Sequence, residues 1–244
     1  MKRSVLIFSL LALLTVVGVS ASFYGRIYLP ITYKQPTPSP TQETPPPTED
    51  PYPHGVQYLP NSFLYESENL LHVVGEVLND TPNSINSVEV GVTFYNDNGN
   101  IQGFGSTLMT PLNLPEYEIG CFDINLDIPP AWSYYDFEPI TYFVGTSSPD
   151  LIILDHNWMY DVDTGTYTIT GQVRNDGSQL SYNVAVGGTL YNNLDEPVGC
   201  AYNYVDNFDL NSGEGSYYLL EFPGPNPSYF DVTHYRLRVT GDLP

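Results

Sequence analysis

Apolar and polar residues alternate with a period of two along most of the chain after residue 55, which is the pattern of β-strands with one buried face. In the clearest example, Tyr167, Ile169 and Val173 alternate with threonine, glutamine and arginine. The same alternation covers four more segments: residues 88–94, 122–126, 184–190 and 218–222. After the N-terminal apolar run, no stretch of the sequence combines helical periodicity with capping residues. The pattern therefore predicts an all-β protein of antiparallel strands.

Two short segments between these strands have the composition of hairpin turns. Asn98-Gly99 suits a type I′ turn, in which both central residues need a positive φ, and a second hairpin is expected at Asp163-Thr164-Gly165. Residues 96–100 also resemble the start of a calcium loop, but the acid that should end a twelve-residue loop is missing. A hairpin is the main interpretation of this segment, and a weak surface Ca²⁺ contact is the alternative.

The chain repeats itself with a period of 96 residues, so that Gly75 corresponds to Gly171. The residues that recur at this spacing are, in the first copy, Gly75, Val77, Asn79, Asp80, Val88, Val90, Gly91, Thr93, Tyr95, Asn96, Gly103, Leu114 and Glu118. A shift of 95 aligns residues 63–66 with residues 158–161. These matches predict a tandem duplication with units at 55–146 and 150–243. A glycine inside a strand predicts the close approach of a backbone or of a large side chain from the facing sheet.

Each unit resembles the FxLYD domain, on motifs that cover nearly all of the chain after residue 55. The matching residues are Phe63, Tyr65, Gly75, Val77, Asn79, Tyr95, Leu114, Glu118 and Phe122 in the first copy and Trp158, Tyr160, Asp161, Gly171, Val173, Asn175, Tyr191, Leu210, Gly213, Glu214 and Tyr218 in the second. The usual Pro-Gly-Glu turn of the family is replaced in both copies, at residues 115–118 and 211–214.

The resemblance implies a module of bacterial and archaeal surface proteins, often without an assigned activity, and it implies no catalytic residues. Independently, six or seven short strands in about 90 residues are typical of an immunoglobulin-like sandwich. We therefore expect two tandem immunoglobulin-like antiparallel β-sandwiches after a signal or anchor segment and a Pro/Thr-rich stalk.

The N-terminus has the features of an export signal. A basic start, Met1-Lys2-Arg3, precedes an apolar run over residues 5–19, and the small residues before position 22 predict cleavage after Ala21. The alternative is an uncleaved anchor that extends to about residue 25, because the 22 uncharged residues between Arg3 and Arg26 match the length of about 20 that spans a bilayer. Either interpretation predicts an extracytoplasmic protein, secreted or anchored to the outer face of the cytoplasmic membrane.

Residues 22–54 are expected to form a linker, rich in proline and threonine from Gln35 to Pro53. Such a tract buries little surface and favours the polyproline II conformation, which makes it a semi-rigid spacer. The linker would hold the two units away from the membrane.

The charge balance limits the class of partner. Seven lysines and arginines stand against 28 aspartates and glutamates, for a formal net charge of -21. Nucleic-acid binding needs clustered cations, so this class is excluded. The expected ligand is neutral, cationic or bridged by a divalent ion. Arg236 and Arg238 share one face of the last predicted strand and could meet an acidic partner weakly.

Candidate chemistry is sparse. The four histidines, His54, His72, His156 and His234, do not have metal-ligand spacing, so neither a metal site nor a cofactor is expected. The sequence also lacks a serine-centred nucleophile elbow and a cysteine with a neighbouring histidine. The abundant acids guarantee some close pair of carboxylates, which by itself indicates nothing. We therefore expect a protein that is not an enzyme.

The two cysteines leave two alternatives open. An exported chain with Cys121 and Cys200 invites one disulfide. Tyr217 and Phe104 occupy the equivalent positions of the other copy, so a bridge would have to join the two units. The alternative is a pair of free buried thiols.

The 21 tyrosines have two possible roles, structural or in binding, and these lead to two hypotheses for the function. Tyrosine fills half-buried sheet positions well, and exposed aromatic residues also form binding platforms. The candidates for a platform are Tyr95, Trp132, Tyr134, Tyr191, Tyr202, Tyr204 and Tyr217. The first hypothesis is a non-enzymatic surface or secreted module with a structural or protein-binding role. The alternative is a carbohydrate-binding or adhesion module that uses exposed tyrosine and tryptophan. The expected partner is accordingly a cell-surface protein or a neutral polysaccharide.

Overall fold

The computed structural model describes residues 55–146, 150–222 and 224–244, which we divide into a first half up to residue 146 and a second half from residue 150. The predicted signal or anchor segment and the predicted stalk lie outside the described residues. Both halves belong to one compact unit. None of the helical segments within the described ranges has the length and hydropathy to cross a membrane.

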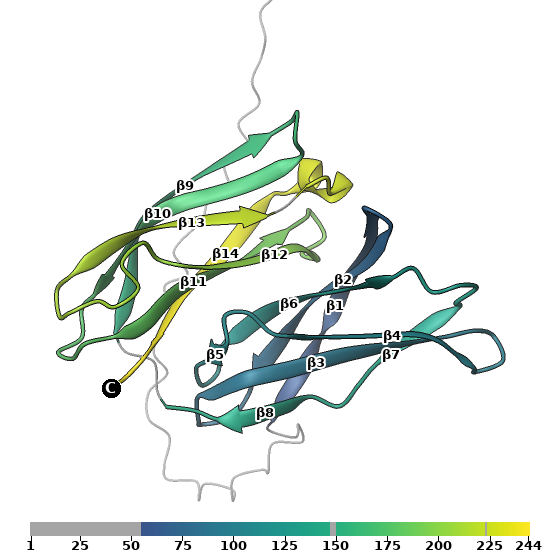
Figure 1. Cartoon of the computed structure of the whole chain (residues 1–244), viewed down its shortest axis with the longest axis horizontal. Helices are drawn as coiled ribbons and strands as arrows, with labels where there is room; N and C mark the ends of the chain where they lie inside the picture. Colours follow the sequence, from purple (N-terminus) through teal and green to yellow (C-terminus); the bar gives the residue numbers. More distant parts are fainter. Residues whose placement is uncertain (1–54, 147–149, 223) are drawn as a thin grey trace, which may run out of the picture. The chain divides into compact units, whose positions relative to one another are not determined.

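The first half contains two antiparallel sheets (Figure 1). Its strands are β1 (Val56–Ser67), β2 (Leu70–Asn79), β3 (Ile85–Tyr95), β4 (Ile101–Leu108), β5 (Asn113–Leu114), β6 (Ile119–Asp127), β7 (Tyr134–Phe137) and β8 (Thr141–Val144). One sheet has the order β1-β2-β6. The other places β3 between β4 and the short strands β5, β7 and β8.

The second half has the same strand order. Its elements are β9 (Leu151–Asp161), β10 (Thr166–Asn175), β11 (Tyr182–Tyr191), β12 (Pro197–Tyr204), β13 (Gly215–Phe222), the 3₁₀ helix η1 (Pro227–Asp231) and β14 (His234–Asp242). The sheets are β9-β10-β13 and β12-β11-β14. The expectation of an all-β sandwich fold is confirmed, and every strand pairing is antiparallel.

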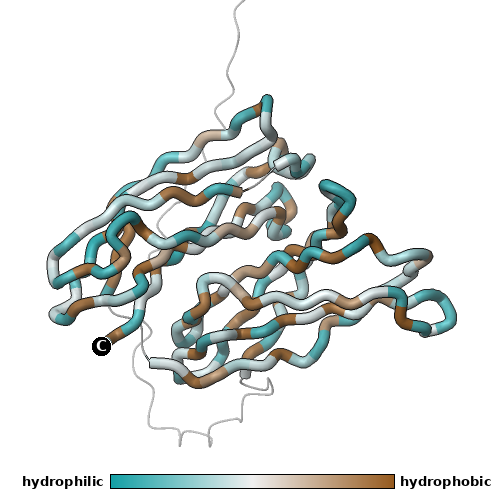
Figure 2. Tube along the Cα trace, viewed as in Figure 1, coloured by the Kyte–Doolittle hydropathy of each residue, from teal (hydrophilic) through white to brown (hydrophobic). Residues whose placement is uncertain are grey.

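Each half has its own apolar core, and the period of two identified its residues correctly. Val88, Val90 and Phe94 are fully buried in the first core, and Ile169 and Leu220 are fully buried in the second. The hydropathy colouring alternates along these strands in the same way (Figure 2). At about 25 cal/mol per Å² of apolar surface, burial of these side chains is the main term that stabilises each half.

A buried asparagine that recurs in both copies fixes the end of the second strand. In the first half the Nδ2 of Asn79 donates to the carbonyls of Asn83 at 2.8 Å and Leu114 at 3.1 Å. In the second half Asn175 Nδ2 donates to Gln179 and Leu210, at the positions 96 residues later, with both distances 2.8 Å. The repeated asparagine therefore satisfies backbone carbonyl groups of the neighbouring loops that form no sheet hydrogen bond.

The glycines in mid-strand make room for an aromatic ring, but the ring does not come from the facing sheet as expected. Gly75 pairs across strands with Phe122 of the same sheet, and a Cβ on Gly75 would lie 2.9 Å from the Cε1 of that ring. Gly171 pairs with Tyr218 in the same way and also faces the backbone oxygen of Asp155. Only glycine allows these rings to lie across the strand.

The motif residues of β1 and β9 face opposite sides of their sheets, which corrects their alignment as equivalents. Phe63 pairs with Val74 and faces away from its own core, whereas Trp158 pairs with the core residue Ile169. The cause is the hairpin that follows each strand. Glu68 and Asn69 form a two-residue turn with φ values of 50° and 67°, while the second hairpin has a four-residue loop. With the longer loop, β1 and β9 correspond at a shift of 94, because Ser62 pairs with Gly75 and His156 with Gly171. The motifs align at a shift of 95, and a difference of one residue reverses the face of a strand.

The turn at Asn98-Gly99 also differs from the expected type I′ geometry. Of its two central residues only Gly99 has a positive φ, 76°. The side-chain oxygen of Asn96 accepts hydrogen bonds from the backbone N–H groups of Asn98 and Asn100, both at 3.0 Å, and this favours a longer loop. The predicted hairpin at Gly165 is confirmed, with a φ of 68° and a 2.8 Å hydrogen bond from its N–H to Asp161 O.

Candidate functional site

A disulfide connects the outer face of the β1-β2-β6 sheet to the outer face of the β12-β11-β14 sheet. Cys121 on β6 and Cys200 on β12 are bonded, with their Cα atoms 5.9 Å apart. Cys121 has the outward parity of its strand, yet it is buried because the second half covers it. Of the two alternatives that the sequence left open, the structure has the bridge. We call this contact between the two sheets the junction.

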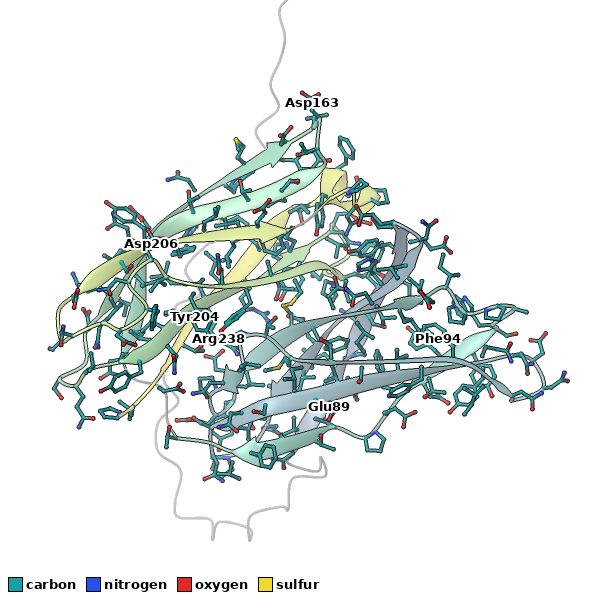
Figure 3. All side chains as sticks on the ribbon, in the orientation of Figure 1. Glu89, Phe94, Asp163, Tyr204, Asp206 and Arg238 are labelled. Atoms are coloured by element: carbon teal, nitrogen blue, oxygen red, sulfur yellow. A yellow bond between two sulfur atoms is a disulfide. The ribbon has the colours of Figure 1, made fainter. Side chains whose placement is uncertain are left out.

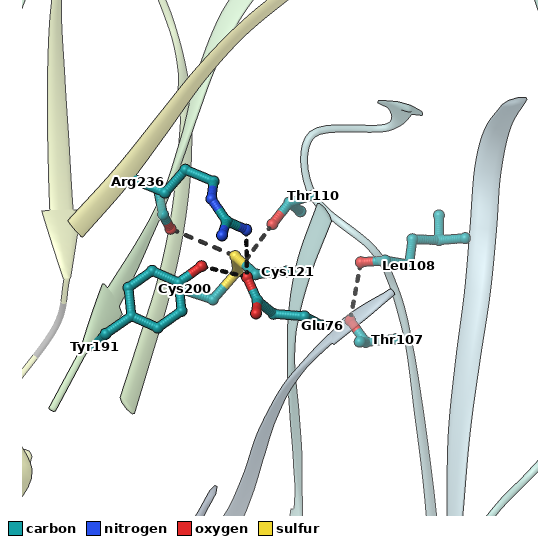
Figure 4. The surroundings of a disulfide bond; sticks show 9 residues. Glu76, Thr107, Leu108, Thr110, Cys121, Tyr191, Cys200 and Arg236 are labelled. Carbon is teal, nitrogen blue, oxygen red and sulfur yellow. Dashed lines mark hydrogen bonds and ion pairs between the residues drawn. A yellow bond between two sulfur atoms is a disulfide. The ribbon is translucent and has the colours of Figure 1, made fainter. Parts of the chain in front are cut away.

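The junction also buries a glutamate beside the disulfide (Figure 4). Glu76 pairs across strands with Cys121 and is 6% exposed. Its Oε1 accepts hydrogen bonds from the Tyr191 hydroxyl and from Arg236 Nη1, the latter at 3.2 Å. Burial raises the pKa of Glu76, and the Tyr191 hydroxyl and the arginines oppose that shift. Glu76 was not among the sequence candidates, because a glutamate at a polar strand position resembles a solvated residue.

Several residues expected on the surface make contacts across the junction instead. Tyr191, a platform candidate, is 4% exposed, and burial raises its pKa. Arg236 lies over the Tyr191 ring, 5.4 Å from its centroid. Arg238 pairs with Glu118 of the first half at 3.1 Å. The two arginines, which the sequence offered for weak contact with an acidic partner, thus each form an ion pair with a glutamate of the first half.

The open edge of the second half forms a groove lined by aromatic side chains. It is lined by residues of the edge strands β9 and β14 and of η1. The cavity has a volume of about 230 Å³. We call it the aromatic groove and define it by Trp158, Tyr160, Tyr167, Tyr229, Phe230 and Tyr235.

Two rings of the groove, those of Trp158 and Phe230, are exposed to solvent, and each packs on a tyrosine ring. Trp158 stacks on Tyr167 with the ring centroids 5.5 Å apart and an interplanar angle of 10°, and 59% of Trp158 stays exposed. Phe230 is 68% exposed and contacts Tyr160 edge to face at 5.1 Å. Burial raises the pKa of Tyr167 to about 12. At neutral pH this ring is therefore uncharged, and the groove presents apolar faces with hydroxyl groups.

A second hollow continues from the groove past Tyr160 and Phe230, which line both. Its volume is about 550 Å³. Its rim includes the carboxylates of Glu66, Glu68 and Asp163. The extended site is thus aromatic at one end and acidic at the other.

The corresponding edge of the first half is filled by its own aromatic residues. Tyr58 on β1 stacks on Phe137 on β7 with the ring centroids 4.4 Å apart. Trp132 packs edge to face on the core residue Phe94 at 5.1 Å. Trp132, a platform candidate, therefore completes the core of the first half.

The other platform candidates are scattered. Tyr95 stacks on Tyr134 at 5.1 Å in the first half. On the second half, Tyr202 and Tyr204 are in edge-to-face contact at 5.4 Å, and Tyr217 lies on β13 with 62% exposure. Tyr204 is labelled in Figure 3.

Sequence reasoning missed Tyr229 and Phe230, which η1 carries into the groove. The signal that could have located η1 is Asn226-Pro227, an N-cap residue followed by proline in the first turn.

The described residues do not assemble a metal centre. Within residues 55–146, 150–222 and 224–244, no group of three histidine, cysteine or acidic side chains is close enough to hold an ion. His72 contacts Asp123 at 3.1 Å, and His156 contacts the Tyr235 hydroxyl at 2.6 Å. These histidines serve local polar contacts.

Comparison with known proteins does not identify a family. Neither a family model nor a curated protein matches the chain. Among solved structures, the exo-chitosanase of Amycolatopsis orientalis has 14% identity and a TM-score of 0.26 over 74% of this chain and 25% of its own. Red sea bream transglutaminase has 10% identity and a TM-score of 0.24 over 75% of this chain and 29% of its own. The chain spans less than a third of either protein, and similarity at this level carries no argument about activity.

Proposed function

We propose that this protein is a non-enzymatic, extracytoplasmic binding module whose aromatic groove binds a neutral polysaccharide. The observation that carries the proposal is the pair of exposed rings, Trp158 packed on buried Tyr167 and Phe230 packed on half-buried Tyr160. The N-terminal sequence supports export, with the module secreted or anchored to the outer face of the cytoplasmic membrane. The FxLYD-like motifs support the same location.

The chemistry of the groove suits a sugar ring better than a charged ligand. A large flat ring gives apolar contact area, and tyrosine hydroxyls give hydrogen bonds at the rim of the same surface. A pyranose has one apolar C–H face and a periphery of hydroxyl groups, so it matches both features. Because Trp158 is held in place by Tyr167, little side-chain entropy is lost when a ligand stacks on it.

The charge of the chain selects among polysaccharides. The acidic rim at Glu66, Glu68 and Asp163 and the net charge of -21 repel uronic acids and sulfated sugars. We therefore expect binding to neutral glycans and none to DNA or heparin at physiological salt. The proposal assigns no hydrolase activity, and loss of such an activity on changing one carboxylate would contradict it.

A structural or protein-binding role is the second candidate. It is favoured by the junction, where a disulfide and the ion pair between buried Glu76 and Arg236 hold the two halves in one arrangement. It is also favoured by exposed apolar side chains on the first half, such as Phe104 and Phe143, which are 59% and 70% exposed. Such a module would act as a rigid spacer that presents surfaces to a neighbouring cell-surface protein.

Polysaccharide pull-down with the full chain tests the glycan proposal. Trp158→Ala should abolish retention on the neutral polysaccharide that the unchanged chain binds. Tyr217→Ala is the matched control, because it removes an exposed aromatic ring from β13, outside the groove. Equal retention of the Trp158→Ala and unchanged chains, or no retention by any neutral polysaccharide, would contradict the proposal and favour the second candidate.

A further inference from the structure

A small pocket lies at the edge of the junction, away from the residues of the aromatic groove. Its volume is about 170 Å³. The residues that give it its chemistry are Asn113 from β5, Asn183 from β11, Tyr202 and Tyr204 from β12, and Asp242 from β14. Because Asn113 belongs to the first half and the others to the second, the pocket exists only when the halves are joined.

Asn113 brings an unsatisfied acceptor into this pocket. The residue is 7% exposed, and its Oδ1 is buried without a hydrogen-bond partner. Most buried polar atoms in native proteins are paired, so an orphaned oxygen at a pocket indicates a missing donor. A water or the donor of a ligand in the pocket can fill this role.

Asp242 adds a negative charge that the described arginines do not neutralise. Its Oδ2 accepts a 2.9 Å hydrogen bond from Asn183 Nδ2. The three arginines of the described residues are engaged with other carboxylates: Arg174 with Asp176, Arg236 with Glu76 and Arg238 with Glu118. The pocket thus combines a carboxylate, a bare carbonyl oxygen and two aromatic rings, without a cation.

These groups select for one kind of ligand. An ammonium group has three donors and no acceptor, and tyrosine faces attract cations. A calcium ion would need six to eight oxygen ligands, and the pocket offers a single carboxylate. The volume is below the roughly 300 Å³ at which pockets for whole small molecules begin, so the pocket suits the end of a side chain.

We propose that this pocket binds the ammonium group of a lysine side chain on a partner protein. The sequence has no lysine after Lys34, so residues 35–244 cannot supply this ligand. The net charge of -21 attracts basic surfaces over a long range. The inference goes beyond glycan binding at the aromatic groove, and its residues do not overlap with the groove.

NMR titration of the isotope-labelled full chain tests this inference. The probe is Nα-acetyl-lysine methylamide, and its neutral counterpart is Nα-acetyl-norleucine methylamide. The lysine probe should shift the side-chain amide signals of Asn113 and Asn183, and the norleucine probe should bind at least about tenfold more weakly because it lacks the charge-assisted hydrogen bonds. Equal binding of the two probes would overturn the inference, and it would assign the orphaned oxygen to water alone.

Variants and a third probe sharpen the result. Asp242→Asn should weaken lysine binding by at least about tenfold, while Asp97→Asn, an acid in the exposed loop after β3, should leave it unchanged. Asn113→Leu should also weaken lysine binding. If Asn113→Leu does not fold, because this residue is buried, the binding measured for Asp242→Asn decides between the two outcomes. Unchanged binding in Asp242→Asn, or tighter binding of glucosamine than of the lysine probe, would overturn the proposal.

Discussion

Removal of the junction disulfide should lower the free energy of unfolding by about 4 kcal/mol. The two cysteines are 79 residues apart in the sequence. In the chain-entropy model a cross-link over a loop of this length stabilises the folded state by about 4.5 kcal/mol, because it restricts the unfolded chain. The Glu76 contacts and the Arg238–Glu118 pair remain when the bridge is removed, so the halves stay in contact in the folded state.

The measurement is urea unfolding of the Cys121→Ala, Cys200→Ala double variant, followed by tryptophan fluorescence. The matched control is Tyr217→Ala, Phe104→Ala, which changes the two exposed positions that correspond to the cysteines in the other copy. Because these are surface substitutions, each should change the unfolding free energy by at most about 0.5 kcal/mol. A loss below about 1 kcal/mol in the double cysteine variant would refute the entropic reasoning. Two reactive thiols in the unfolded, unreduced protein would refute the bridge itself.

Three further predictions concern residues of the first half. Gly75→Val should cost about 1–3 kcal/mol through overpacking against Phe122, and Phe122→Leu in the same chain should recover part of that loss in urea unfolding. The pKa of Glu76 is raised above its ordinary 4.5 in the folded state, so its stabilising contribution is complete below that pH and is lost as the pH rises through the folded pKa. Glu76→Gln should therefore flatten the decline of unfolding free energy with pH, and identical slopes would contradict the assignment. Asn79→Ala should cost about 1–3 kcal/mol by leaving buried carbonyls unpaired, whereas an effect near zero would show that water replaces the amide.

The sequence predicted the cores well, because a period of two has a direct physical meaning in a sheet with one buried face. Every inward position assigned on the third strand of each copy, such as Val90 and Val186, is fully buried. The same rule failed for the motif residues of β1 and β9. Phe63 and Trp158 face opposite ways because the second hairpin loop is two residues longer, so the strands correspond at a shift of 94 (Ser62 with His156) and the motif alignment at 95 is one residue out of register. Sequence identity at the motif does not reveal the length of a turn.

The junction could not be predicted from either copy alone. Tyr191 and Glu76 sit at outward positions, where a strand pattern predicts exposure, and only the packing of one half on the other buries them. The aromatic groove was anticipated in part. Trp158 and Tyr160 were identified as repeat motif residues, but the groove also needs Tyr229 and Phe230, which η1 places after a turn with no strand pattern.

The most direct test of the account is whether Trp158 itself contacts a glycan. Trp132→Phe leaves Trp158 as the single tryptophan of the chain, because the sequence has only two. A neutral polysaccharide that retains the full chain should then change the Trp158 emission saturably, and Phe230→Ala should weaken that response. If the polysaccharide is retained while the Trp158 emission stays constant, the ligand binds elsewhere and the aromatic groove is not its site.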